Sequence, residues 1–270
     1  MCKKEETGMN VLSHLKSVEV LRHAETIDHY IAKCKSSFLN TQSRKSYYYF
    51  PKYIQSDDAD SAKQIINGLL IHIHPHLKKL IKNTPIFVIL MNITAENGMP
   101  HTRSTDVICL PHSIVANTPS FLNTIEHELW HIHQKKYNAQ WEVFFTKHWH
   151  FKKWGGKLPD VLEDKIRFNP DTVDAPLWVW NDTWVPIPIF TNITSPTLSD
   201  TDVWFYNIDS HRVRKEVPPN MLSFFSDNLP KIAYEHPREI SAYLLSSRSN
   251  KDKFHYKKSP AYNNLYAEFE

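Results

Sequence analysis

Two histidines in the middle of the chain are spaced so that they could bind one metal ion. Residues 125–131 read Ile-Glu-His-Glu-Leu-Trp-His, which contains the pattern His-Glu-x-x-His. Residues four apart on a helix lie one above the other on one face, so His127 and His131 can reach a common metal. Glu128 lies roughly 100° around the helix from His127, beside the position that such a metal would leave open. A carboxylate at that place can remove a proton from a water molecule.

The segment around these histidines has the features of a core helix. Thr118 is a residue type favoured at a helix N-cap, and Pro119 follows it at the first helical position. Apolar residues then recur at intervals of three and four and form one stripe through about residue 137. Residues 106–110, Asp-Val-Ile-Cys-Leu, are closed by a proline and predict a strand before the helix. The stripe consists of Phe121, Ile125, Leu129 and Ile132.

The motif, its capped amphipathic helix and the preceding strand resemble the zincin metallopeptidases. In that family the strand before the metal helix is the sheet edge to which an extended peptide substrate adds. The resemblance implies a zinc site at His127 and His131, with Glu128 as the general base and residues 106–110 as the substrate-binding edge. The alternative is two surface histidines on an ordinary helix of a chain that contains sixteen histidines.

A catalytic zinc usually has three protein ligands, so two histidines leave one to be found. Residues 234–243 offer Glu235, His236 and Glu239, and Pro237 starts a helix in which Glu239 stands near the third position. Glu235 and His236 precede that helix and would approach a metal from a looser segment. The segment resembles the gluzincin branch of the zincins, in which a glutamate on a second helix, often within Glu-x-x-Ala, completes the site. The resemblance implies that Glu239 is the third ligand.

Glu239 also has an ordinary structural interpretation, because glutamate at the third position of a helix is favoured by capping and by the helix dipole. Many gluzincins carry an acid shortly after the glutamate ligand that orients the first histidine, and Tyr243 stands there in this chain. A metal-bound imidazole normally donates its other N–H, so the partner of His127 must come from another segment. Tyr243, His211 and Arg238 are our candidates for stabilising the negative charge that develops on the substrate oxygen.

A second set of histidines, at alternate positions of residues 71–76, competes as a metal site. On a strand, His72, His74 and His76 would point to one side, a geometry that some zinc sites use. Pro75 interrupts the strand, and no acid or base stands nearby in the sequence. We therefore favour neutral histidines that lie on the surface or are partly buried.

The remaining sequence predicts helices and short strands. Helical spacing indicates helices within residues 11–35, 61–70 and 237–245, and the apolar run 86–91 indicates a buried strand. After residue 149, tryptophan- and proline-rich runs predict further short strands at 177–180, 184–185, 187–190 and 203–206. Two polar segments in this region, residues 167–171 and 209–212, could face substrate, but we expect both to be solvated loops.

We therefore predict an α+β chain in three parts. Residues 1–60 form a helical and extended N-terminal region. Residues 61–150 form a zincin-like N-lobe, with a small mixed sheet whose edge strand lies beside the motif helix. Residues 151–270 form a C-terminal lobe with short strands and the ligand-bearing helix. A length of 270 residues suits one domain of two lobes or two small domains.

Composition excludes several classes of protein. Hydrophobic residues at 41% and aromatic residues at 13% argue against disorder. The 32 basic and 29 acidic residues are interspersed, so no field for nucleic acid is indicated. Cys2, Cys34 and Cys109 form neither a disulfide framework nor a metal pair, and we expect free thiols in a reducing compartment. No run is long enough to span a bilayer and no apolar signal segment begins the chain, so we expect a soluble, cytoplasmic protein.

Together these features predict a zinc-dependent metallopeptidase that binds one Zn²⁺ per chain and cleaves peptide or protein substrates. Glu128 would take a proton from the attacking water and pass it to the leaving amine. One alternative is a non-catalytic binding or structural protein whose zinc only ties the two lobes together, although a purely structural site gains nothing from Glu128. Another is a zinc hydrolase of a non-peptide bond.

Overall fold

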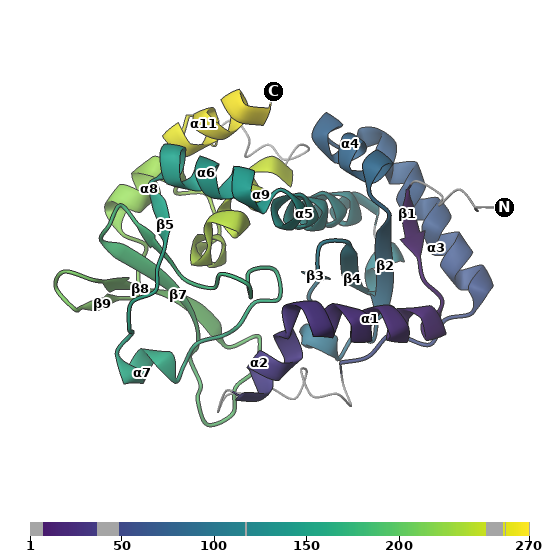
Figure 1. Cartoon of the computed structure of the whole chain (residues 1–270), viewed down its shortest axis with the longest axis horizontal. Helices are drawn as coiled ribbons and strands as arrows, with labels where there is room; N and C mark the ends of the chain where they lie inside the picture. Colours follow the sequence, from purple (N-terminus) through teal and green to yellow (C-terminus); the bar gives the residue numbers. More distant parts are fainter. Residues whose placement is uncertain (1–7, 37–48, 117, 247–255, 257, 270) are drawn as a thin grey trace. The chain divides into compact units, whose positions relative to one another are not determined.

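Two separate sheets and the helices around them make up the α+β structure of the chain, for which a computed structural model describes residues 8–36, 49–116, 118–246, 256 and 258–269 (Figure 1). Internal contacts divide the chain into two compact units, each with its own sheet. Unit 1 spans Met1–Lys35 and Gln42–Lys136, and unit 2 spans Ser36–Thr41 and Tyr137–Glu270. The α+β class predicted from the sequence is confirmed, whereas the division at residues 60 and 150 stays a prediction.

Unit 1 contains a four-stranded mixed sheet with the order β1-β2-β4-β3. The first three strands in that order run parallel, and β3 runs antiparallel to β4. β2 and β4 are almost wholly buried, which agrees with the short apolar runs from which they were predicted. The strands are β1 (Met9–Val11), β2 (Ile86–Met91), β3 (His101–Arg103) and β4 (Val107–Pro111).

The strand before the motif helix is not an edge strand, so the predicted substrate-binding edge at residues 106–110 is wrong. β4 pairs with β2 on one side and with β3 on the other. The chain reverses between β3 and β4 through Ser104, which has a positive φ of 50° and whose hydroxyl donates to Asp106 Oδ1 at 2.8 Å. Because β3 is only three residues long and polar, no alternation in the sequence predicts it.

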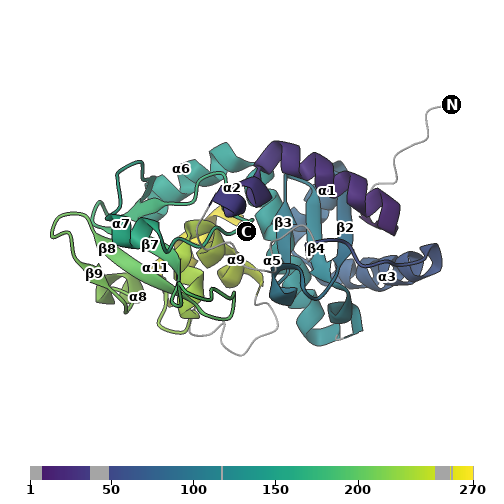
Figure 2. The ribbon, with the colours of Figure 1, turned by 90° about the horizontal axis from the view of Figure 1, so that it is seen from below.

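The helices of unit 1 cover its sheet and include the predicted ones. α5 packs against β3 and β4, α4 packs against α5, and α3 packs against β1 (Figures 1 and 2). The predicted helical segment at residues 11–35 is two helices, because His29 takes a left-handed conformation between them. The helices are α1 (His14–Asp28), α2 (Tyr30–Ser36), α3 (Ser56–Leu69), α4 (Pro75–Asn83) and α5 (Thr118–Lys136), with short 3₁₀ turns η2 (Leu70–His72), η3 (Ala95–Gly98) and η4 (His112–Ala116).

Unit 2 contains a five-stranded sheet in which each neighbouring pair is antiparallel and the strand order follows the sequence. Its strands are β5 (Phe151–Lys153), β6 (Trp178–Trp180), β7 (Trp184–Phe190), β8 (Thr201–Asn207) and β9 (Val213–Arg214). Its helices are α6 (Asn138–Trp149), α7 (Asp160–Glu163), α8 (Pro219–Phe225), η5 (Lys231–Glu235), α9 (Pro237–Ser246) and α11 (Pro260–Phe269).

β7 is one strand where the sequence predicts two, and its prolines explain the difference. Pro186 and Pro188 lie within a strand that pairs with β8 along its whole length. In an antiparallel strand the N–H and C=O of one residue point to the same side. The carbonyl of Pro188 accepts from the Arg167 N–H at 2.8 Å, so both prolines lack their N–H on the side away from β8. The ladder with β8 is therefore intact, and residues near 167 are bound along the other side of β7.

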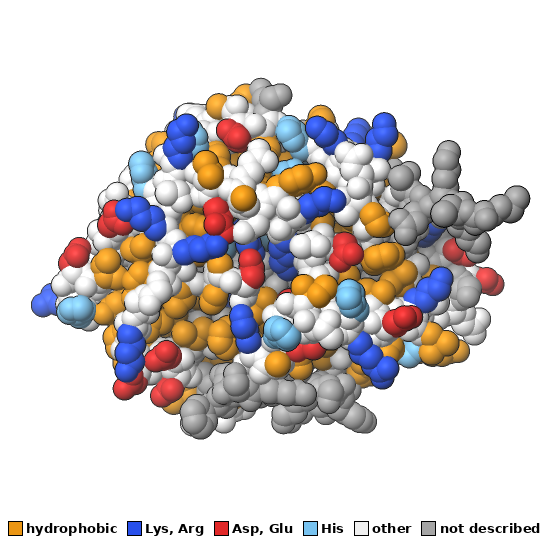
Figure 3. Space-filling model, in the orientation of Figure 1, with side chains coloured by type: hydrophobic (Ala, Val, Ile, Leu, Met, Phe, Trp, Pro, Cys, Tyr) orange, Lys and Arg blue, Asp and Glu red, His pale blue; other side chains and the backbone are white. Residues whose placement is uncertain are grey.

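The helices of unit 2 enclose an aromatic core. Trp141 of α6 stacks on Phe269 of α11 with ring centroids 4.6 Å apart, and Trp149 Nε1–H donates to the Ala261 carbonyl at 3.1 Å. The C-terminal segment, for which the sequence pattern predicts nothing, thus forms a helix that packs on α6. On the face shown in Figure 3, basic and acidic side chains are interspersed.

Candidate metal centre

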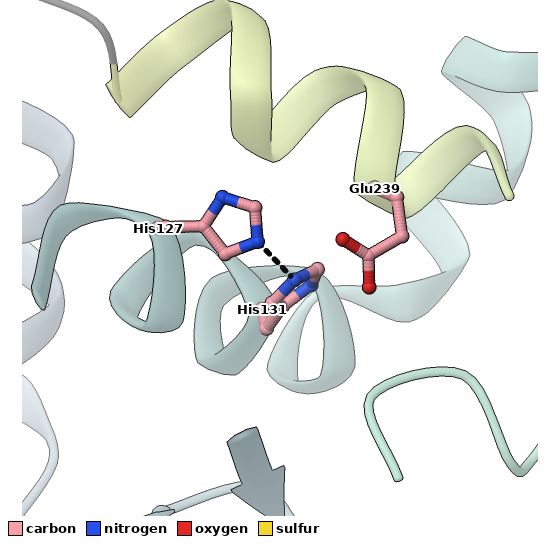
Figure 4. Close-up of side chains that lie close together, drawn as sticks. All are labelled: His127, His131 and Glu239. Atoms are coloured by element: carbon pink, nitrogen blue, oxygen red, sulfur yellow. Dashed lines mark hydrogen bonds between the residues drawn. The ribbon is translucent and has the colours of Figure 1, made fainter. Parts of the chain in front are cut away.

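α5 carries both histidines of the motif on one face, as their spacing predicts. The Nε2 atoms of His127 and His131 are 3.0 Å apart, and the two rings meet edge to face at 78° (Figure 4). His131 is fully buried and His127 is partly buried. Two imidazole nitrogens at this distance share a proton or face a common cation.

Gln134 orients the second histidine. Its Oε1 lies 2.9 Å from Nδ1 of His131, and the amide side chain is fully buried one turn further along α5. Because an amide oxygen can only accept, Nδ1 of His131 carries the proton and Nε2 presents a lone pair. This is the tautomer that a metal ligand needs. Sequence reasoning missed Gln134, although a polar side chain three residues after the second histidine was a usable signal.

Glu128 is buried next to the first histidine. Its side chain is 3% exposed, and it follows His127 directly on α5. A helix advances roughly 100° per residue, so the carboxylate stands to one side of the face that carries the two imidazoles. The predicted general base therefore lies on the expected element and is shielded from bulk water.

Glu239 lies in the first turn of α9, two residues after the predicted Pro237 start. His236 caps this helix: its Nδ1 accepts from the Arg238 N–H at 3.1 Å, and its Nε2–H donates to the Ala175 carbonyl at 2.9 Å. Both ring nitrogens are thus used within unit 2. Burial, helped by the Arg238 guanidinium, lowers the pKa of His236 to about 3, so the ring is neutral. The rival ligand His236 is therefore ruled out.

Glu235, the other rival ligand, is held within unit 2 as well. Its Oε2 pairs with the guanidinium of Arg167, and its Oε1 accepts from Asn169 Nδ2 at 2.5 Å. The side chain of Glu235 is almost completely buried. Burial raises the pKa of Glu235, and the nearby Arg167 charge opposes that rise. With both oxygens engaged, Glu235 is not available as a ligand.

The three residues predicted as ligands lie close together. His127, His131 and Glu239 each offer one ligand atom, and these atoms all lie within 4.8 Å of one another. Figure 4 shows the Glu239 carboxylate extending from α9 towards the imidazole of His131. Within the described ranges this is the only group of three or more histidine, cysteine or acidic side chains that could hold a metal ion. Two imidazoles and one carboxylate suit zinc, whereas calcium and magnesium prefer oxygen ligands alone.

The other predicted site residues differ in position. Tyr243 is partly buried one turn after Glu239 on the same helix. His211 is exposed in the turn before β9, where its Nδ1 lies 2.8 Å from the Tyr206 hydroxyl. β9 lies at the end of unit 2 away from α9 (Figures 1 and 2). Arg238 is buried, and its two terminal nitrogens donate to the carboxylate of Asp174 at 2.6 and 2.7 Å. Its charge is therefore paired with a carboxylate within unit 2.

Of the two polar segments expected to be solvated loops, only one is. Residues 209–212 are exposed, as predicted. The prediction for residues 167–171 is wrong, because Arg167, Asn169 and Asp171 are each at most 8% exposed. The physical reason is that this segment lies along β7 and that its polar groups find buried partners, which periodicity in the sequence cannot reveal.

The competing histidines do not lie on a strand, so the alternative metal site with His72, His74 and His76 on one side of a strand is wrong. His72 is exposed in η2, and His74 is the N-cap of α4, whose Nδ1 accepts from the His76 N–H at 3.2 Å. Pro75, which made the strand doubtful, begins the helix. The ring of His74 packs on Trp130 of α5 at 5.2 Å between centroids. These rings are packing elements of unit 1.

His133 of α5 belongs to the same packed group. Its ring centroid lies 6.3 Å from that of His76, and burial together with the neighbouring His76 and His74 lowers the pKa of His133 to about 3. Of the competing histidines, His72 is exposed, His76 is partly buried and His74 is buried.

No protein-family model matches this chain, and comparisons with curated proteins and with solved structures give no significant match. Among the residues described, no helix combines the length and apolar character needed to cross a membrane. Cys34 and Cys109 are buried and do not form a disulfide with each other, whereas Cys2 lies outside the described residues. A proposal for function therefore rests on the residues and geometry of the site.

Proposed function

We propose that the protein is a zinc-dependent metallopeptidase, with His127, His131 and Glu239 as zinc ligands and Glu128 as the general base. The observation that carries the proposal is the group of two imidazole nitrogens and one carboxylate oxygen within 4.8 Å of one another. Three protein ligands with one open position are the arrangement of catalytic zinc, whereas structural zinc usually has four protein ligands. A base beside the open position has a use only in catalysis.

The sheet of unit 1 supports the resemblance to zincins. It is a small mixed sheet whose edge strand β3 runs antiparallel to β4 and packs against α5, the helix with the motif. All three residues of β3 are at most 2% exposed and α1 packs on this strand, so we assign no peptide-binding role to it.

Glu128 and Gln134 would have different roles in the proposed reaction. When bound, zinc would polarise the scissile carbonyl and acidify the attacking water. Glu128 takes one proton from that water, whose oxygen bonds to the carbonyl carbon, and delivers the proton to the nitrogen as the C–N bond breaks. Gln134 keeps His131 in the tautomer that faces the metal with a lone pair. No covalent bond between substrate and enzyme forms.

The change Glu128→Gln tests the proposal. The amide keeps the shape of the side chain but cannot accept the proton, so zinc content should stay at about one per chain while cleavage falls on the order of 10²–10⁴-fold. Zinc is measured by elemental mass spectrometry and cleavage with a library of fluorogenic peptides. Glu126→Gln, the same change on the same helix two residues earlier, is the matched control and should keep both properties.

Two outcomes would count against the peptidase. Unchanged cleavage by Glu128→Gln would show that the proposed base is not the base. Stoichiometric zinc without cleavage of any library peptide by the wild-type protein would favour the non-catalytic alternative, and cleavage of ester but not peptide bonds would favour a hydrolase of another class.

A further inference from the structure

Asn169 connects two buried carboxylates of unit 2. Its Nδ2 donates to Glu235 Oε1 at 2.5 Å and to Glu239 Oε1 at 2.9 Å. Asn169 is 8% exposed, and the two glutamates are 3% and 7% exposed. A hydrogen bond to a charged acceptor in such a shielded place is stronger than one in water.

The orientation of the Asn169 amide follows from its partners. Its Oδ1 accepts from the Asp171 N–H at 2.9 Å, which leaves the NH₂ group for the two carboxylates. The opposite orientation would set the amide oxygen against two carboxylates and the NH₂ group against an N–H donor. The NH₂ group therefore donates to both carboxylates and Oδ1 accepts from the backbone, so these partners determine the orientation of the amide.

The segment that carries Asn169 is held on both sides of this residue. The Arg167 N–H donates to the Pro188 carbonyl of β7 at 2.8 Å, and the Arg167 guanidinium pairs with Glu235. Pro170 follows directly and restricts the backbone of Asn169 to extended conformations. All of these contacts lie within unit 2, the unit that carries Glu239.

We propose that Asn169 is a positioning residue for the metal ligand Glu239, and that Arg167 and Glu235 hold Asn169 in place. This inference rests on the proposed metal site. By binding one oxygen of the Glu239 carboxylate, Asn169 limits the rotation of that side chain and fixes the direction in which the carboxylate faces. A ligand that is oriented before the metal arrives loses less rotational freedom on binding, so zinc affinity rises.

Zinc affinity of the full-length chain, measured by competition with a chromophoric chelator, tests this role. Asn169→Ala should weaken zinc binding about 10–100-fold, the range usual for residues that orient metal ligands. Asn264→Ala removes a side-chain hydrogen bond from the same unit, that of Nδ2 to the His148 carbonyl at 2.9 Å, and should leave the affinity unchanged. Asn169→Asp, which keeps the shape and the acceptor for Asp171 but removes both donors, should also weaken binding.

A double-variant comparison separates positioning from a general loss of structure. In a Glu239→Ala background, Asn169→Ala should cause no further loss of zinc affinity, because the residue on which it acts is gone. An equal loss in both backgrounds, or wild-type affinity in Asn169→Ala, would overturn the inference while the metal site stands. A wild-type chain that binds no zinc would overturn the proposed function itself. Thermal unfolding of the metal-free variants shows whether each one is folded.

Discussion

The two helices that carry the candidate ligands obtain their geometry in different ways. α5 holds His127 and His131 through their own spacing, and Gln134 on the next turn orients the second ring. α9 contributes only Glu239, whose carboxylate is held by Asn169 from a distant segment of unit 2. On α5 the positioning groups come from the same helix, and on α9 they come from residues that are about 70 positions away.

This difference predicts different responses to substitution. A change on α5 alters a ligand or its immediate neighbour, so it should act on the metal directly. A change around α9 can also act through the capping residue His236, the buried Arg167–Glu235 pair or Asn169. Its effect on zinc affinity should therefore be separable from its effect on the free energy of unfolding. Three experiments test this contrast, in order of expected effect.

Removing both ligands of α5 should have the largest effect. A His127→Ala, His131→Ala double variant should retain no stoichiometric zinc, because a single carboxylate is a weak zinc site. The His74→Ala, His76→Ala double variant is the matched control from the packed histidine group of unit 1 and should keep about one zinc per chain. Elemental analysis of the purified proteins measures both, and zinc retained by the first variant would place the metal elsewhere.

Replacing the ligand of α9 should have the next largest effect. Glu239→Gln exchanges an anionic ligand for a neutral amide, so zinc affinity should fall by more than the roughly 100-fold upper range for an orienting residue. Glu163→Gln makes the same change at an exposed position of unit 2 and should bind zinc as the wild type does. If Glu239→Gln shows wild-type affinity in the chelator competition, Glu239 is only a favourable residue of the first helical turn.

The cap of α9 should give the smallest effect, and it should depend on pH. Burial lowers the pKa of His236 from 6.5 to about 3. Between pH 6.5 and 3 the unfolded chain therefore binds a proton at this residue that the folded chain does not bind. The free energy of unfolding therefore falls as the pH falls from about 6.5 towards 3. Between about pH 7.5 and 5.5 this one group removes roughly 1.4 kcal/mol.

His236→Asn tests this assignment in metal-free protein by urea unfolding at the two pH values. Asparagine keeps a side-chain acceptor for the Arg238 N–H and does not titrate, so the variant should lose roughly 1.4 kcal/mol less between them. His133 is present in both proteins and contributes equally to both slopes. An unchanged slope would mean that His236 is protonated in the folded chain at the lower pH.

Several features of the fold and the site could be predicted from the sequence, because they depend on short-range geometry. The spacing of His127 and His131 on a helix needs only the helical period, and the start of α9 needs only Pro237. The α+β class followed from apolar runs and helical stripes for the same reason. Glu239 was predicted as the third ligand from the resemblance to the gluzincins. No local pattern in the sequence indicates that it lies near His127 and His131.

Only the tertiary structure decided which polar residues are buried and which strands have free edges. Residues 167–171 contain charged and amide side chains that are typical of a loop, yet they are buried because β7 and Glu235 supply their partners. β4 is an inner strand because the short, polar β3 pairs with it. Pairing and hydrogen bonding join residues that are far apart in the chain, and local periodicity carries no information about such partners.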